Sequence, residues 1–181
     1  MTYDREVIKL PIEKAGPAIH RVYGPPPRVE VVIATSQKAP QEWRYTTTKP
    51  ADDWFRADAD VSAWQTGPGG FGTRGTPGTV VRTEWKTPDI WIRRTFELSD
   101  KHPPDRLQLS MHHDEDAEVY LNGVLAQKMQ GYTVDYQMFE IRREARAALR
   151  PGKNTIAIHC KQTCGGQYID AGIVELIDAT E

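Results

Sequence analysis

The Asn122-Gly123 dipeptide, which stands between two apolar runs, constrains the fold more than any other feature of the sequence. Asn-Gly in this setting favours a two-residue turn between antiparallel strands, because both residues tolerate the positive φ that such turns require. Further segments rich in β-branched and aromatic residues lie on both sides of it, and glycine and proline separate them. Strands are therefore predicted for residues 29–33, 42–48, 90–98, 107–112, 118–126, 154–160 and 173–177.

The rest of the sequence holds one helical segment and one long irregular segment. Residues 143–149 are rich in alanine and arginine and are followed by proline and glycine, which predicts a short helix. Residues 67–78 consist largely of glycine and proline, which excludes helix and central strand and predicts a long surface loop. Many short strands with one helical turn predict an all-β fold, an antiparallel β-sandwich.

Length and charge set the domain count and exclude two classes of protein. The 181 residues favour one domain, with residues 29–181 as the sandwich and the proline-rich residues 1–28 as an arm or linker. The 23 Lys+Arg against 25 Asp+Glu give a net charge of -2, which argues against nucleic acid as a partner. No apolar run approaches the ~20 residues of a membrane helix, and the N-terminus has no apolar signal-peptide core.

Five sequence blocks occur in an order and spacing typical of one family of domains. Together they resemble the jelly-roll sugar-binding domain of glycoside hydrolase family 2 and related galactose-binding-like modules of bacterial glycan-active proteins. The resemblance covers residues 43–177. The blocks are Trp54 with residues 58–64, then Phe71-Gly72, residues 90–98, residues 117–123 and residues 149–158.

The resemblance implies a jelly roll that serves as a non-catalytic carbohydrate-binding or accessory module. In such enzymes the catalytic carboxylates lie on a separate barrel domain, so this chain by itself is expected not to be an enzyme. Its expected partners are an oligo- or polysaccharide and a catalytic domain of a parent protein, with an extracellular or periplasmic location as part of that protein. One alternative is a purely structural jelly roll packed against a catalytic domain.

The densest polar run of the chain is residues 112–116, His-His-Asp-Glu-Asp. Strand alternation places His112 and Asp114 on an outer face, and His159 on an outer face of a later strand. If those strands are neighbours, the three side chains meet and suit a transition metal, which gives a second alternative, a small metal-dependent enzyme. A simple strand end without any ligand explains the same residues. No cofactor is expected, although carboxylates at 114–116 also suit a structural calcium ion.

Carbohydrate binding requires aromatic platforms and polar side chains on loops or outer faces. Trp85 and Trp91 are the candidate platforms, at least one of them exposed, whereas Trp54 and Trp64 are expected to pack inside. Residues 165–172 form a glycine-supported loop before the last strand, a place where ligand contacts are common. The candidate carbohydrate-binding residues are Trp85, Trp91, His112, Asp114, His159, Gln167, Tyr168 and Asp170.

Three further residues carry structural predictions. Alternation sends Arg94 inward unless a β-bulge intervenes, so an ion pair with Asp170 or with the acidic run 114–116 is expected. Cys160 and Cys164 are separated by only three residues, and a disulfide between them would close a very small ring. They are therefore expected to be free thiols, Cys160 in the core and Cys164 in a loop.

Overall fold

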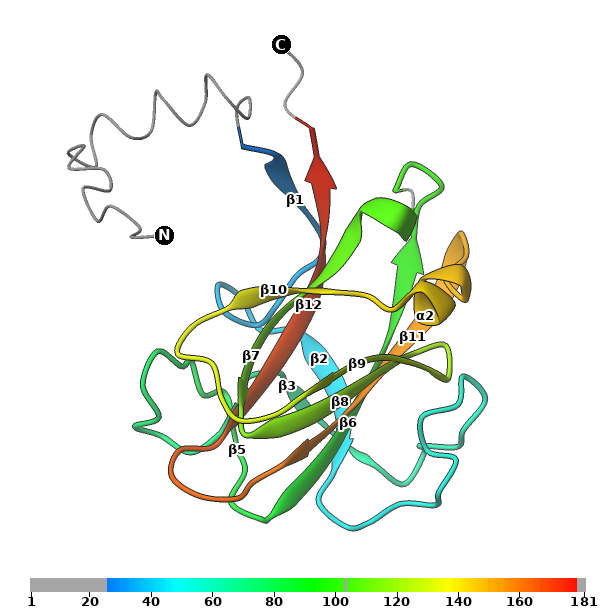
Figure 1. The fold of residues 1–181 in the computed structure, drawn as a ribbon. Coiled ribbons are helices and arrows are strands. Elements are labelled where there is room, and N and C mark those ends of the chain that lie inside the picture. Colours follow the sequence, from blue (N-terminus) through cyan, green and yellow to red (C-terminus); the bar gives the residue numbers. More distant parts are fainter. Residues whose placement is uncertain (1–25, 103, 179–181) are drawn as a thin grey trace, which may run out of the picture.

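The computed structural model describes residues 26–102 and 104–178, which form a sandwich of two six-stranded sheets (Figure 1). The predicted all-β class is thus confirmed. Of the expected arm at 1–28, all but the last three residues lie outside the described part of the chain, and Arg28 already begins the first strand. No helix in the described ranges is long and apolar enough to cross a membrane.

The first sheet, called sheet A, has β12 at its centre. Strands β1 and β4 share one edge of β12, with β1 along its C-terminal half and β4 at its first two residues. All pairs are antiparallel except β4 with β5. The order is β10 (Gln137–Glu140), β7 (Leu107–Asp114), β12 (Tyr168–Ile177), β4 (Phe71–Gly72) and β5 (Thr83–Glu84), with β1 (Arg28–Ile33) also on β12.

The second sheet, called sheet B, is antiparallel throughout and is centred on the long pair β6 and β11. A short helix, α2 (Arg143–Ala147), covers β8 and β9 at one end, and a 3-10 turn, η1 (Pro104–Arg106), precedes β7. The order is β3 (Gln65–Pro68), β2 (Glu42–Thr46), β6 (Asp89–Leu98), β11 (Gly152–Lys161), β8 (Asp116–Leu121) and β9 (Val124–Met129).

The predicted turn at Asn122-Gly123 joins β8 and β9. Both residues have positive φ, 48° for Asn122 and 87° for Gly123, as this turn class requires. The Asn122 amide also donates hydrogen bonds to the Ala148 carbonyl at 2.7 Å and to Asn154 Oδ1 at 2.8 Å. The hairpin is therefore fastened to the end of α2 and to β11.

The core lies between the apolar faces of the two sheets. Alternation on β7 buries Leu107, Leu109 and Met111 completely, and Ile156 and Ile158 of β11 face them from sheet B. Burial of a large aliphatic side chain contributes roughly 1.5–3 kcal/mol. The outer faces of both sheets carry the polar positions, and loops cover parts of them.

The glycine-rich segment 67–78 is not a loop throughout, as the sequence predicts, because its ends belong to strands. Its first residues end β3 in sheet B, and Phe71-Gly72 form β4 in sheet A. The chain crosses between the sheets at Gly69-Gly70. Gly70 has φ +82°, and a Cβ there would collide with the Val80 carbonyl oxygen. Only glycine allows this close crossing.

The inward orientation of Arg94 is confirmed, but its predicted ion pair is wrong. The guanidinium donates to the Ala34 carbonyl at 3.1 Å and to Gln41 Oε1 at 2.9 Å, and it lies 6.0 Å from the centre of the Trp43 ring. No carboxylate of the described residues lies within 4.0 Å of it. Backbone and amide oxygens accept its hydrogen bonds instead, and the charge of Asp170 acts on it without a direct contact.

Candidate functional site

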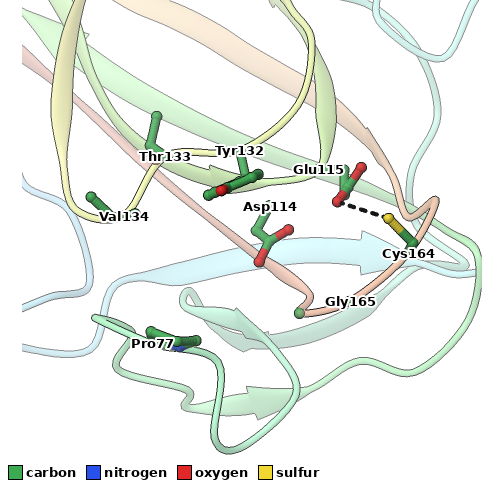
Figure 2. Close-up of a pocket in the computed structure, with 9 residues that line it drawn as sticks. Pro77, Asp114, Glu115, Tyr132, Thr133, Val134, Cys164 and Gly165 are labelled. Atoms are coloured by element: carbon green, nitrogen blue, oxygen red, sulfur yellow. Dashed lines mark hydrogen bonds between the residues drawn. The ribbon is translucent and has the colours of Figure 1, made fainter.

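A pocket of about 290 Å³ lies at the C-terminal end of β7, where three loops that are distant in sequence converge (Figure 2). The loops are residues 76–78, 132–134 and 163–166. Exposed loops held on a rigid sheet are a common place for ligand sites. The pocket is lined by Pro77, Asp114, Glu115, Tyr132, Thr133, Val134, Cys164, Gly165 and Gly166.

Tyr132 forms one wall of the pocket, and neighbouring backbone contacts fix its place. It pairs with Asp114 in an antiparallel β-bridge, so the two side chains emerge side by side. The next residue, Thr133, donates its N–H to the His113 carbonyl at 2.8 Å and accepts from His112 Nε2 at 3.1 Å. The Tyr132 side chain itself is not held, and the residue is 66% exposed.

Asp114 is the most deeply placed acid of the pocket, with only 8% of the residue exposed. Among the described residues, no donor lies within hydrogen-bond distance of its carboxylate. The Gly166 backbone passes close to it, so that a Cβ at this position would collide with Asp114 Oδ2. Burial and the neighbouring Glu115 both raise the pKa of the Asp114 carboxyl.

Glu115 stands at the mouth of the pocket, beside the loop that carries the exposed cysteine (Figure 2). Its carboxylate accepts a short hydrogen bond from Thr163 Oγ1, and its Oε1 lies 3.7 Å from Cys164 Sγ. Both cysteines are free thiols, Cys164 exposed and Cys160 buried, as the sequence predicts. Burial raises the pKa of the Cys160 thiol.

The predicted ligand residue Gln167 has a structural place behind the pocket, where it makes hydrogen bonds to two loops. Its N–H donates to Thr76 Oγ1 at 3.1 Å, which anchors the loop that carries Pro77. Its side-chain amide donates to the Thr87 carbonyl at 2.6 Å, and the residue is buried. Gln167 therefore positions two loops and does not face the pocket.

The expectation that Trp85 or Trp91 is exposed is wrong. Trp85 is 2% exposed and belongs to the core, and its indole N–H donates to Thr87 Oγ1 at 3.0 Å. Trp91 is 8% exposed on the outer face of sheet B, where the His159 ring covers it. Trp54 and Trp64 are half-buried. Neither of the two predicted platforms is therefore open to a ligand.

The expected meeting of His112 and His159 does not occur. Both point outward, as alternation predicts, but β7 belongs to sheet A and β11 to sheet B, so they lie on opposite sides of the sandwich. Within residues 26–102 and 104–178, no group of three or more His, Cys, Asp or Glu side chains is placed to hold a metal ion. The acidic run is split as well, because Asp116 Oδ1 instead accepts from the N–H of Gly131 at 2.7 Å.

Three other predicted residues, His112, Tyr168 and Asp170, do come together on the outer face of sheet A. The carboxylate of Asp170 accepts hydrogen bonds from the Tyr136 hydroxyl and from the N–H of Ser36, both at 2.6 Å. All three predicted residues are fully buried beneath covering loops. Burial raises the pKa of Asp170 to about 6. This cluster fastens loops and is closed to a ligand.

Sequence reasoning overlooked Tyr132 and considered Glu115 only as part of the acidic run 114–116, as a ligand for calcium or a partner for Arg94. The available signal was the turn residue Gly131 directly before an aromatic residue, just after a predicted strand. The return of this segment to the end of β7 is a tertiary contact between residues 18 positions apart, Asp114 and Tyr132. No local pattern predicts such a contact.

Comparison of the sequence with protein-family models and with curated proteins gives no match. The fold, however, is similar to parts of several solved structures. A glycosyl hydrolase family 2 member from Bacteroides cellulosilyticus has a TM-score of 0.52 at 16% identity, over 81% of this chain and 20% of that one. Bacteroides uniformis β-glucuronidase 2 has a TM-score of 0.55 at 15% identity, over 83% of this chain and 18% of that one. Ruminococcus gnavus β-glucuronidase has a TM-score of 0.55 at 12% identity, over 83% of this chain and 28% of that one.

These similarities establish a shared fold and no more, because the identities are low. The present chain spans between about a fifth and about a quarter of the length of those enzymes. The fold of this chain is therefore similar to one part of each of those enzymes.

Proposed function

We propose that this chain is a non-catalytic accessory domain of jelly-roll type that binds carbohydrate as part of a bacterial glycan-active protein. The observation that carries the proposal is the pocket at the end of β7, where the exposed Tyr132 ring stands beside the carboxylates of Asp114 and Glu115. The fold similarity to single domains of glycoside hydrolases supports the accessory role.

The pocket offers the two kinds of contact that a sugar needs. The apolar face of a pyranose ring packs on an aromatic side chain, and its hydroxyls donate hydrogen bonds to carboxylates. A volume of about 290 Å³ lies at the lower end of small-molecule sites, which are roughly 300–1,000 Å³. The site fits one sugar unit of a longer glycan better than several units.

The proposal includes an extracellular or periplasmic location as part of a larger protein, where polymeric glycans are encountered. The purely structural alternative remains a distinct hypothesis, in which the sandwich packs against a catalytic domain and binds no sugar. Glycan binding by the chain alone separates the two hypotheses.

The test is isothermal titration of the full chain with a panel of plant, algal and host oligosaccharides. Saturable binding by at least one glycan is expected, and Tyr132→Ala should weaken it about tenfold, which corresponds to about 1.4 kcal/mol. Val31→Ala is the matched control, because Val31 is equally exposed but lies on β1 outside the pocket. Absence of binding by every glycan, or equal loss in both variants, would contradict the proposal.

A further inference from the structure

We infer that the pocket at the end of β7 prefers sugar units that carry a free, protonated amino group. This inference deepens the proposed function and rests on it, since it names the class of sugar that the same site takes. Three observations support it: the charge of the lining residues, the absence of a hydrogen-bond donor at the Asp114 carboxylate and the neighbouring ring of Tyr132.

The lining of the pocket has one sign of charge. Asp114 and Glu115 are its only carboxylic acids, and none of the nine lining residues is a lysine, arginine or histidine. The other polar groups are the Thr133 and Tyr132 hydroxyls, the Cys164 thiol and the loop backbone. Such a pocket attracts a cation and repels the carboxylate of a uronic acid or a sulfate group.

The Asp114 carboxylate lacks a partner that a cation would supply. Asp114 is 8% exposed as a residue, its carboxylate faces the pocket, and no donor of the described residues hydrogen-bonds to it (Figure 2). The carboxylate oxygens are not sealed from solvent, so a ligand in the pocket can reach them. An ammonium group placed there provides both opposite charge and donors, and charge-assisted hydrogen bonds of this kind are about twice as strong as neutral ones.

Tyr132 argues for an amino sugar over other cations. Its ring stands next to Asp114 through the β-bridge between the two residues, so it supplies a flat apolar surface beside the acid. A pyranose can pack on that surface while its amino substituent reaches the carboxylate, and the ring face itself attracts ammonium. A bare metal ion makes no use of the ring, and the described residues hold no group of metal ligands.

The test compares three oligosaccharides of equal length by isothermal titration of the full chain. They are a glucosamine tetramer with free amines, its fully N-acetylated form and a uronic acid tetramer. The free-amine tetramer should bind at least tenfold more tightly than the acetylated one, and the uronate should not bind. Equal affinity for the amine and acetylated forms would overturn this inference while leaving carbohydrate binding intact. Absence of binding by all three tetramers and by the wider panel of glycans would contradict both this inference and the proposed function.

Two variants assign the preference to the pocket. Asp114→Asn keeps the shape and should reduce the ratio of amine to acetylated affinity to about threefold or less, whereas Glu97→Gln should leave it unchanged. Glu97 is an exposed acid of β6 outside the pocket and controls for general attraction of a cationic oligomer. Thermal melting checks that Asp114→Asn stays folded. Binding of a lysine-rich peptide but no amino sugar would contradict the inference and indicate a protein partner instead.

Discussion

The indole of Trp91 and the imidazole of His159 lie face to face, with ring centres 4.7 Å apart and planes inclined by 7°. The two residues are direct cross-strand partners on β6 and β11. His159 Nε2 also lies 2.7 Å from Asp89 Oδ1. One side chain thus covers the tryptophan and binds the acid, which explains why Trp91 is closed to a ligand.

Replacing His159 should therefore destabilise sheet B. We expect His159→Ala to lower the free energy of unfolding by about 1–3 kcal/mol, because it removes the ring contact and leaves Asp89 unpaired. Urea denaturation at pH 6 measures this. His159→Phe keeps the stacking and should lose less, so equal losses in the two variants would show that the ring contact contributes nothing.

The buried guanidinium of Arg93 holds a loop on the outer face of sheet B. It donates to the carbonyl oxygens of Trp54 and Ala57, both at 2.8 Å. Arg93→Met should cost roughly 2–3 kcal/mol of stability, since hydrogen bonds of charged groups contribute about 1.5–3 kcal/mol and two carbonyls lose their donor. It should also speed tryptic cleavage after the exposed Arg56 severalfold.

The control for that experiment is Arg150→Met, an exposed arginine on the turn before β11. This variant should leave cleavage after Arg56 unchanged. Slow cleavage in both variants would mean that other contacts hold the loop.

Asp170 should make the protein less stable as the pH rises. Its pKa is about 6 in the folded chain, against about 3.9 for an unfolded aspartate, so between these values the folded state binds more protons. As the pH rises between these two pKa values, Asp170 should lower the free energy of unfolding by roughly 2–3 kcal/mol. Urea titrations from pH 4 to pH 7 should show the slope in the wild type and a flatter profile for Asp170→Asn.

The exposed Asp53 provides the control, because Asp53→Asn should retain the wild-type slope. An unchanged profile for Asp170→Asn would mean that Asp170 does not titrate between pH 4 and pH 7.

The attraction between Asp114 and an amino sugar should depend on pH. As the pH falls, this attraction should be lost at a higher pH than an ordinary aspartate would lose it, because the pKa of Asp114 is raised. The pKa of Asp114 is raised by burial and by Glu115, against a small opposing effect of His113, so Asp114 takes up its proton early as the pH falls. The other ionisable side chains that line the pocket beside it are those of Glu115, Tyr132 and Cys164. Because the sugar amine also gains its proton as the pH falls, the quantity to follow is the ratio of wild-type to Asp114→Asn affinity for the glucosamine tetramer at pH 7, 6 and 5, which should decrease as Asp114 takes up its proton.

The pH dependence that remains in Asp114→Asn includes the protonation of the sugar amine, which is common to both proteins. A ratio of affinities that stays constant from pH 7 to pH 5 would show that protonation of Asp114 does not control binding in this range.

Local pattern was enough to predict much of the fold. The turn at Asn122-Gly123, the alternation along β7 and the short helix α2 follow from residues close together in sequence, and the structure confirms each. The short strands β3, β4, β5 and β10 were missed because they have two to four residues and exist only through their neighbours.

The candidate site was harder to predict, for a specific reason. Alternation correctly gives His112 and His159 an outward direction, but it does not say to which sheet each strand belongs. Sheet membership depends on pairings between distant segments, such as β7 with β12 and β11 with β6. Asp114, predicted to share a surface with His112 and His159, lies instead beside Tyr132, which reaches it through a non-local contact.

The three loops of the pocket span residues 76 to 166, about half of the chain. No contiguous fragment much shorter than the domain contains them all, and closing such distant segments into one place is slow and costs chain entropy. The pocket can therefore exist only after sheet A is assembled. Ligand binding should then report whether folding is complete, and a bound sugar would protect the whole domain, not one loop, against unfolding.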